Sequence, residues 1–146
     1  MEFNHLNANL KHTASKLPES VAYTFAGRDV TYAQFDRLVS NVSGALYDLG
    51  LRQGDGLAIL LPNSDAFLLA YHGAFRLGMY CVPMNPLYTP NEILYMLKDS
   101  GAKAVVAPAQ FAEMAGALNA MLPGLTFFHK GMYAFFAVFG LKHFIK

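Results

Sequence analysis

Cysteine is nearly absent from this sequence, because Cys81 is the single one among its 146 residues. One cysteine cannot form an intramolecular disulfide, and it cannot supply the paired thiolates of a CxxC metal site. A disulfide framework is therefore excluded, and so is a metal site of that type. This usage fits a reducing compartment, so we predict a cytoplasmic protein.

Charged residues are also scarce. They make up 14% of the chain, against about 25% in an average globular protein. Together with an apolar content of 54%, this argues against intrinsic disorder and favours a packed core with some exposed apolar surface. Eleven basic and ten acidic residues give a net charge of +1. With no basic cluster, we expect no nucleic-acid partner.

Long hydrophobic runs are missing as well. Residues 1–17 contain no apolar core of a signal peptide, and no run reaches the roughly 18 apolar residues of a membrane span. The nearest approach is residues 131–141 (GMYAFFAVFGL). The total length suits one domain, because domains cluster near about 100–150 residues.

Motifs for metal binding, phosphate binding and nucleophilic catalysis are also missing. No HExxH, GxGxxG, GxxxxGKS/T or GxSxG pattern occurs. His5 and His12 share one helix face but lie about two turns apart, too far to hold one metal ion. All the histidines are scattered along the chain: His5, His12, His72, His129 and His143.

The turn at residues 61–64 (LPNS) leads from an apolar run into a helix, which is where an α/β protein binds phosphate. Pro62 removes a backbone donor that a phosphate would need. We therefore interpret the segment as a tight turn into a helix capped by Ser64. Cys81, inside an expected strand, is interpreted as an inert small apolar residue.

The carboxylates have structural explanations. Asp65 and Glu92 lie at helix starts, where the positive end of the helix dipole favours them. Asp36 and Asp48 are placed on the polar face of one helix. From residue chemistry alone we therefore assign no catalytic residue, no cofactor-binding residue and no metal ligand.

Hydrophobic periodicity predicts an N-terminal helix that Pro18 ends, with apolar positions 3, 6, 10, 14 and 17 on one face. Residues 21–25 alternate as in a strand. A turn is expected at residues 26–29, and the next element begins at residue 30. These two short segments suggest a β-hairpin.

Residues 31–49 give the clearest helix, with a capping box of Thr31 and Gln34, an apolar stripe from Tyr32 to Leu49, and a stop at Gly50. A second capping box, Thr89 and Glu92 with Pro90 between them, starts another helix. Beyond residue 50 strands and helices alternate: strands at 57–61, 79–82, 103–107 and 125–128, and helices at 64–78, 89–100 and 108–122. The last helix is expected to turn five side chains inward: Phe111, Met114, Leu118, Met121 and Leu122.

This order of elements predicts an α/β fold. Alternating strands and helices favour a mainly parallel sheet with helices on both faces. An N-terminal helix and a β-hairpin precede that sheet.

Five segments then form an ordered set: residues 30–35 (VTYAQF), 50–55 (GLRQGD), 61–64 (LPNS), 76–86 (RLGMYCVPMNP) and 92–103 (EILYMLKDSGAK). In sequence and spacing they resemble the N-terminal part of the adenylate-forming (AMP-binding) enzymes, which include acyl-CoA synthetases, luciferases and peptide-synthetase adenylation domains. The NPLYTPNE stretch is most similar to fatty-acyl-CoA synthetases. One departure is Gly56, where the family usually has valine.

The resemblance implies that residues 1–128 are an incomplete N-terminal portion of the AMP-binding domain, a partial N-terminal subdomain of the adenylate-forming fold. It implies a parent enzyme that uses ATP, Mg and CoA to convert an acid, here a fatty acid, into an acyl-CoA through an acyl-adenylate. The family's phosphate loop (TSGTTGxPKG), ribose-binding aspartate and C-terminal lysine do not occur in this sequence. We therefore carry over no catalytic residue, expect no cofactor for this chain, and expect it to be inactive alone.

Residues 129–146 do not resemble the family. One hypothesis is a frameshifted or prematurely ended tail, and the other is a short helix that makes weak membrane-surface contact through residues 131–141. For the whole chain, the alternative to a synthetase fragment is a small non-catalytic interaction module. Because an incomplete subdomain exposes an apolar face, we expect self-association or association with a chain that supplies the missing domains.

Overall fold

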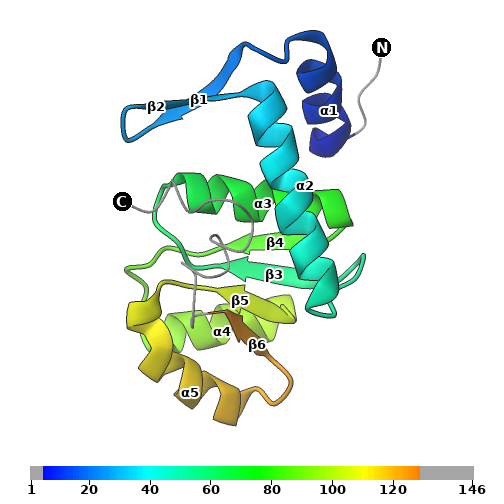
Figure 1. The fold of residues 1–146 in the computed structure, drawn as a ribbon. Helices are drawn as coiled ribbons and strands as arrows, with labels where there is room; N and C mark the ends of the chain where they lie inside the picture. The colour runs from blue at the N-terminus through cyan, green and yellow to red at the C-terminus, as the bar shows by residue number, and fades with distance from the viewer. Residues whose placement is uncertain (1–4, 129–146) are drawn as a thin grey trace.

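The computed structural model describes residues 5–128, and its centre is a four-stranded sheet with helices on both faces (Figure 1). The strands are β3 (Gly56–Ile59), β4 (Tyr80–Pro83), β5 (Ala104–Val106) and β6 (Thr126–Phe128). Their spatial order is β4-β3-β5-β6, and every neighbouring pair is parallel. The predicted α/β architecture with a parallel sheet is confirmed.

Strand β3 shows why its sequence does not alternate in polarity. All four of its residues are buried. Leu57 and Ile59 belong to a core formed with α2 (Tyr32–Asp48) and α3 (Asp65–Leu77). Ala58 belongs to a second core, on the other face of the sheet. That core includes residues of α4 (Pro90–Ser100) and α5 (Ala112–Met121).

The N-terminal part consists of α1 (Leu6–Lys16) and an antiparallel hairpin of β1 (Val21–Phe25) and β2 (Arg28–Thr31). The turn is shorter than predicted, because only Ala26 and Gly27 lie between the strands. Both have positive φ angles, of 51° and 74°, as a two-residue hairpin turn requires. The expected hairpin is confirmed.

The apolar face predicted for the first helix is only partly correct. Leu10 is buried, whereas Leu6 and Leu17 are exposed. Helix α1 packs on α2 and α3 from one side only, so a narrow stripe is enough to hold it. Phe3 lies outside the described residues.

The predicted capping boxes are both present. At the start of α2, Gln34 N donates to Thr31 Oγ1 at 3.3 Å and Thr31 N donates to Gln34 Oε1 at 2.9 Å. At the start of α4, Thr89 N donates to a carboxylate oxygen of Glu92 at 2.7 Å. This bond and the one from the Thr89 hydroxyl lower the pKa of Glu92.

The ends of the helices are also close to prediction. Ser64 caps α3 by accepting from Phe67 N at 3.2 Å, and Gly78 and Gly101 end α3 and α4 in the left-handed conformation. Leu49 departs from the predicted stripe of α2. It follows the last helical residue and is 49% exposed.

The last predicted helix is divided in the structure. Residues Ala109–Phe111 form a 3-10 turn (η1), and α5 follows it. Pro108 has an extended ψ of 156°, so the helix cannot start there. Met121, predicted to point inward, is 59% exposed, because α5 rests on the sheet through Ala115 and Leu118.

None of the helices between residues 5 and 128 is long and apolar enough to cross a membrane. The segment 131–141, for which membrane-surface contact is predicted, lies outside the described residues.

Candidate functional site

The topology places one crevice where open parallel sheets bind ligands. Strand β3 continues into α3 on one face, while its neighbour β5 continues into α5 on the other face. The connections diverge at the carboxyl ends of these two strands, and such a switch point is the usual ligand site of the fold class.

The polar groups of Ser64 and Asp65 at this switch point make hydrogen bonds within their own turn. The Ser64 hydroxyl donates to Pro62 O at 2.9 Å and accepts from Phe67 N. Asp65 Oδ1 accepts from Ala66 N at 2.8 Å. Pro62 and Pro108 supply no N–H group. Ser64 and Asp65 are thus engaged in the cap of α3, and the two prolines offer no donor to a phosphate at this edge.

The loop that follows β4 borders the same carboxyl edge. Asn85 closes a turn there: its carbonyl accepts from Tyr88 N at 3.0 Å, and its side-chain Oδ1 accepts from Leu87 N at 3.0 Å. Leu87 is 89% exposed at the corner of this turn. The loop offers apolar surface and contains no carboxylate, histidine or lysine.

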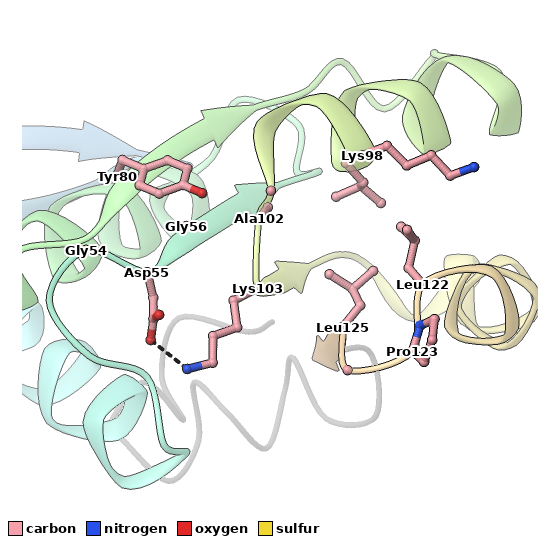
Figure 2. Close-up of a pocket in the computed structure, with 13 residues that line it drawn as sticks. Gly54, Asp55, Gly56, Tyr80, Lys98, Ala102, Lys103, Leu122, Pro123 and Leu125 are labelled. Carbon is pink, nitrogen blue, oxygen red and sulfur yellow. Dashed lines mark hydrogen bonds and ion pairs between the residues drawn. The ribbon is translucent and has the colours of Figure 1, made fainter.

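A shallow cleft of about 500 Å³ lies at the opposite edge, near the amino ends of the strands (Figure 2). Leu122, Pro123 and Leu125 lie along one side of it. Asp55 and Lys103 lie on another side, where Lys103 Nζ is 3.0 Å from Asp55 Oδ2. Burial raises the pKa of Asp55, but the hydrogen bonds from Lys103 and from the backbone N–H of Arg52 outweigh it and lower the pKa. Asp55 is therefore a paired carboxylate and a poor general base.

Tyr80 closes the cleft above Gly56. Its hydroxyl donates to Ser100 O at 2.8 Å, which ties β4 to the end of α4. A Cβ atom on Gly56 would lie 2.3 Å from Cζ of the Tyr80 ring. Glycine at this position, a departure from the family pattern, leaves the space that the Tyr80 ring occupies, and any larger residue would have to displace this half-exposed ring.

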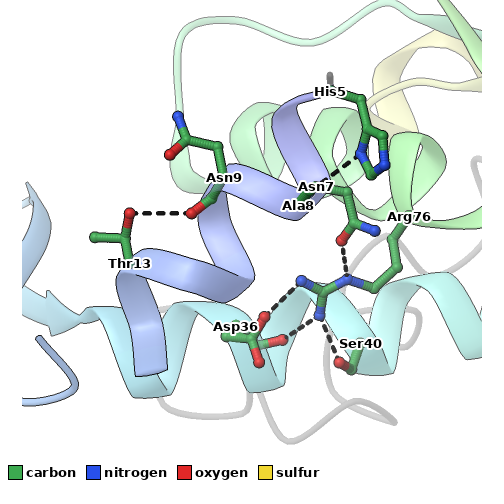
Figure 3. A network of polar contacts seen from close by, with 8 residues as sticks. All are labelled: His5, Asn7, Ala8, Asn9, Thr13, Asp36, Ser40 and Arg76. Carbon is green, nitrogen blue, oxygen red and sulfur yellow. Dashed lines mark hydrogen bonds and ion pairs between the residues drawn. The ribbon is translucent and has the colours of Figure 1, made fainter. Parts of the chain in front are cut away.

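Arg76 is the centre of the largest polar network, shown in Figure 3. Its guanidinium donates to Asn7 Oδ1 at 2.7 Å, to Asp36 O at 2.8 Å and to Ser40 Oγ at 2.6 Å. A further bond and ion pair join it to the Asp36 carboxylate. The Arg76 side chain is only 8% exposed. The network joins α1, α2 and α3, so its role is to hold three helices together.

This network corrects the interpretation of Asp36. The sequence placed Asp36 on the polar face of its helix and gave it no partner, whereas the carboxylate faces α3 and pairs with Arg76. No local pattern could have revealed a pair separated by 40 positions.

A depression of about 660 Å³ lies next to Arg76, between the start of α1 and the end of α3. The guanidinium of Arg76 makes its hydrogen bonds to α1 and α2. Arg76 therefore offers no unpaired positive charge to a ligand in that depression.

His72 is a half-buried titratable group at the α2–α3 interface. Its ring packs edge-on against Phe35 at 5.1 Å, and its Nδ1 is buried without a hydrogen-bond partner among the described residues. Burial, followed by the nearby charge of Arg76, lowers the pKa of His72. The folded chain therefore binds a proton at His72 less readily than the unfolded chain.

We expect acid to weaken the fold through His72. Above the unfolded pKa of about 6.5 both states are neutral, and the histidine adds no pH dependence. As pH falls below that value, the unfolded state takes up the proton first, so the free energy of unfolding falls. Urea denaturation at pH 7.5 and 5.5 should show this loss, and His72→Phe should reduce it. An equal loss in both proteins would contradict the assignment.

Cys81 lies in β4, as predicted, and is half-buried. Burial raises the pKa of its thiol to about 12, and Sγ is 3.7 Å from Tyr71 O. A protonated thiol is a poor nucleophile.

Within residues 5–128, no three histidine, cysteine or carboxylate side chains gather as a possible metal site. Of the five histidines, His129 and His143 lie outside the described range.

Comparison with known proteins gives one consistent result. A family model described as AMP-binding enzyme matches residues 10–126. The long-chain-fatty-acid–CoA ligase FadD13 of Mycobacterium tuberculosis is 36% identical over 113 residues, which are 76% of this chain and 22% of the ligase. The 4-coumarate–CoA ligase 3 of Arabidopsis thaliana is 37% identical over 87 residues, 60% of this chain and 16% of that ligase.

Solved structures agree with these relatives. The N-terminal domain of FACL13 from M. tuberculosis superimposes with a TM-score of 0.75 at 29% identity, covering 86% of this chain and 34% of that one. A fatty acyl CoA synthetase of the same organism gives a TM-score of 0.76 at 31% identity, with 84% and 26% covered. The chain spans about a fifth of the length of the curated relatives it matches.

Proposed function

Because this chain belongs to the family of AMP-binding enzymes, we propose that it supplies the N-terminal part of an ATP-dependent acyl-CoA synthetase. The reaction is the joining of an acid to a thiol through an acyl-adenylate, and the acid is a fatty acid. The observation that carries this proposal is the similarity to the fatty-acid ligase FadD13 over 76% of this chain.

The described residues support a structural role for this chain. Both faces of the sheet are covered by helices, and at the carboxyl edge Ser64 and Asp65 are engaged in the hydrogen bonds that cap α3. ATP, Mg and CoA would be bound by later segments of a full-length synthetase. We propose that this chain binds none of them alone and is catalytically inactive.

An exchange assay tests the inactivity. The purified 146-residue chain, given ATP, Mg²⁺, a fatty acid and labelled pyrophosphate, is expected to form no labelled ATP above a protein-free blank. The reason is that the described carboxyl edge offers no group that neutralises charge on a phosphate. Exchange above the blank would overturn the proposed inactivity.

A chimera tests the family role. Residues 1–126 would replace the matching segment in the FadD13 ligase, and acyl-CoA formation would be compared with the parent ligase. Measurable fatty-acid-dependent activity is expected. A chimera that unfolds cooperatively, as the parent does, but has no activity would contradict the assignment as the N-terminal part of such an enzyme.

We also propose a reducing, cytoplasmic setting, supported by the single half-buried thiol. The other role considered, a small interaction module that self-associates or contacts a membrane surface, is the alternative. Exposed apolar side chains such as Leu87 and Tyr95 favour association with another protein surface.

A further inference from the structure

Strand β4 forms one edge of the four-stranded sheet (Figure 1). Its inner side pairs with β3, and within residues 5–128 no strand pairs with its outer side. An unpaired edge presents backbone N–H and C=O groups on which a further strand can form. A protein with such an edge needs a feature that prevents pairing between its own copies.

The backbone N–H groups of β4 alternate between the two sides of the strand. Tyr80 N and Met84 N donate to carbonyl oxygens of the β3 segment, at 3.2 Å and 2.9 Å. Because successive N–H groups of a strand point in opposite directions, those at positions 81 and 83 face outward. Position 83 is a proline, which has no N–H group. The outer side of β4 therefore carries one donor, at Cys81, where a strand without proline would carry two.

Other features that protect an edge are few in β4. Proteins protect edge strands by short length, charged side chains, bulges or proline. The strand has four residues, but no charged side chain occurs between positions 79 and 91. Its register with β3 runs without interruption, so no bulge turns the edge aside. Pro83, which is exposed, is therefore the main feature at this edge that opposes pairing.

We propose that Pro83 closes the outer edge of β4 to a second copy of this chain. Two copies would pair their β4 strands antiparallel about a two-fold axis, because identical edges meet in this way. In that pair each proline would leave a carbonyl of the other copy without a donor, and its ring would occupy the space of the missing hydrogen. This role of Pro83 is independent of the acyl-CoA synthetase reaction.

Pro83→Ala tests this role. The substitution restores the outward N–H group and removes apolar surface, so a gain in association cannot come from added apolar contact. The dissociation constant for pairing of the full 146-residue chain is expected to fall by about tenfold or more, because each pair of copies gains two hydrogen bonds. Sedimentation velocity over a range of protein concentrations measures this change.

Pro123→Ala is the matched control. Pro123 is also exposed, but it lies between α5 and β6, outside the strands. Its replacement restores no N–H group at the β4 edge, so this variant should associate like the unaltered chain. Pro83→Lys restores the same N–H group as Pro83→Ala but adds a charge, which opposes edge pairing. It should therefore associate less than Pro83→Ala.

Hydrogen exchange locates the contact. In associated Pro83→Ala, the amides at positions 81 and 83 should exchange several-fold more slowly than in the dilute protein, because they then donate to the other copy. The amides of β3 should keep the protection that they have in the unaltered chain.

Four results would overturn the proposal. The first is equal sedimentation of Pro83→Ala and the unaltered chain. The second is association without slower exchange at positions 81 and 83, because the contact would then lie elsewhere. The third is loss of protection in β3, which would show that Pro83 acts by stabilising the fold. The fourth is association of Pro123→Ala as strong as that of Pro83→Ala, which would show that the β4 edge has no special role.

Discussion

Replacing Gly73 with alanine is expected to lower the free energy of unfolding by about 2 kcal/mol. Gly73 lies in α3 where that helix meets α2. A Cβ atom there would lie 2.5 Å from Cγ1 of Val42 and 3.4 Å from the backbone nitrogen of Ser43. Val42 is completely buried, so it has no free space into which to move.

The same substitution elsewhere should have the opposite sign. Gly44 lies in α2, and a Cβ atom there would meet nothing within 4 Å. Gly44→Ala should therefore stabilise the chain by about 0.5–1 kcal/mol, the gain in helix propensity. Urea denaturation of both variants separates the steric cost from the propensity gain.

A double substitution identifies the cause. If Val42 is the obstacle, Gly73→Ala combined with Val42→Ala should cost less than the sum of the two single changes. Strict additivity, or a Gly73→Ala protein as stable as the unaltered chain, would show that the two helices separate easily. The close approach of α2 and α3 would then not be a fixed feature of the fold.

Replacing Arg76 with alanine is expected to cost about 2–3 kcal/mol. Four hydrogen bonds disappear, among them those to Asn7 and Ser40. The Asp36 carboxylate loses its partner, but its 32% exposure lets water replace part of that interaction, so the cost stays below that of a fully buried broken pair. For a chain of this size, each kcal/mol lowers Tm by about 2–4 °C.

The effect should be concentrated in α1. Asn7 is the α1 residue that Arg76 holds, so hydrogen exchange in α1 should become faster than in the sheet. Arg76→Lys keeps the charge but cannot make the forked contacts of a guanidinium, so its loss should be intermediate. Arg37→Ala, at an exposed arginine of the same α2 helix, is the control and should change stability by less than about 0.5 kcal/mol. Equal protection of α1 in all variants would contradict the proposed anchoring.

Features that depend on neighbouring residues were predictable from the sequence. The capping boxes at Thr31 and Thr89 need only side chains three positions apart, and both are present. The parallel sheet followed from the alternation of strands and helices, because that alternation leaves few other ways to connect strands. The family resemblance, which rested on five ordered segments, is also confirmed.

Features that depend on distant parts of the chain were not predictable. The width of the buried face of α1 depends on where this helix contacts α2 and α3. The spacing of its apolar residues therefore predicted a wider buried face than the structure has. The Arg76–Asp36 pair joins two helices whose sequences carry no shared signal. The exposure of Leu87 was not predictable either, because it depends on the turn that the bonds to Asn85 form.

The candidate site shows the same difference between features set by neighbouring residues and features set by distant parts of the chain. The sequence carries no phosphate-binding or nucleophile motif and therefore predicts no chemistry at the turn after β3. That this turn lies at a switch point of the sheet required the order of all four strands. A local motif can show which groups are present, and only the topology shows which groups meet.

The contact between Gly56 and the Tyr80 ring also has an evolutionary consequence. A family member with valine at the position of Gly56 has to hold a tyrosine ring in another position, because the Cβ atom would overlap the ring where it lies here. The two positions are therefore expected to covary, with a large ring at one paired with glycine at the other. A sequence that changed only Gly56 would have to swing the half-exposed Tyr80 ring outward, and the ring would lose its hydrogen bond to Ser100 O.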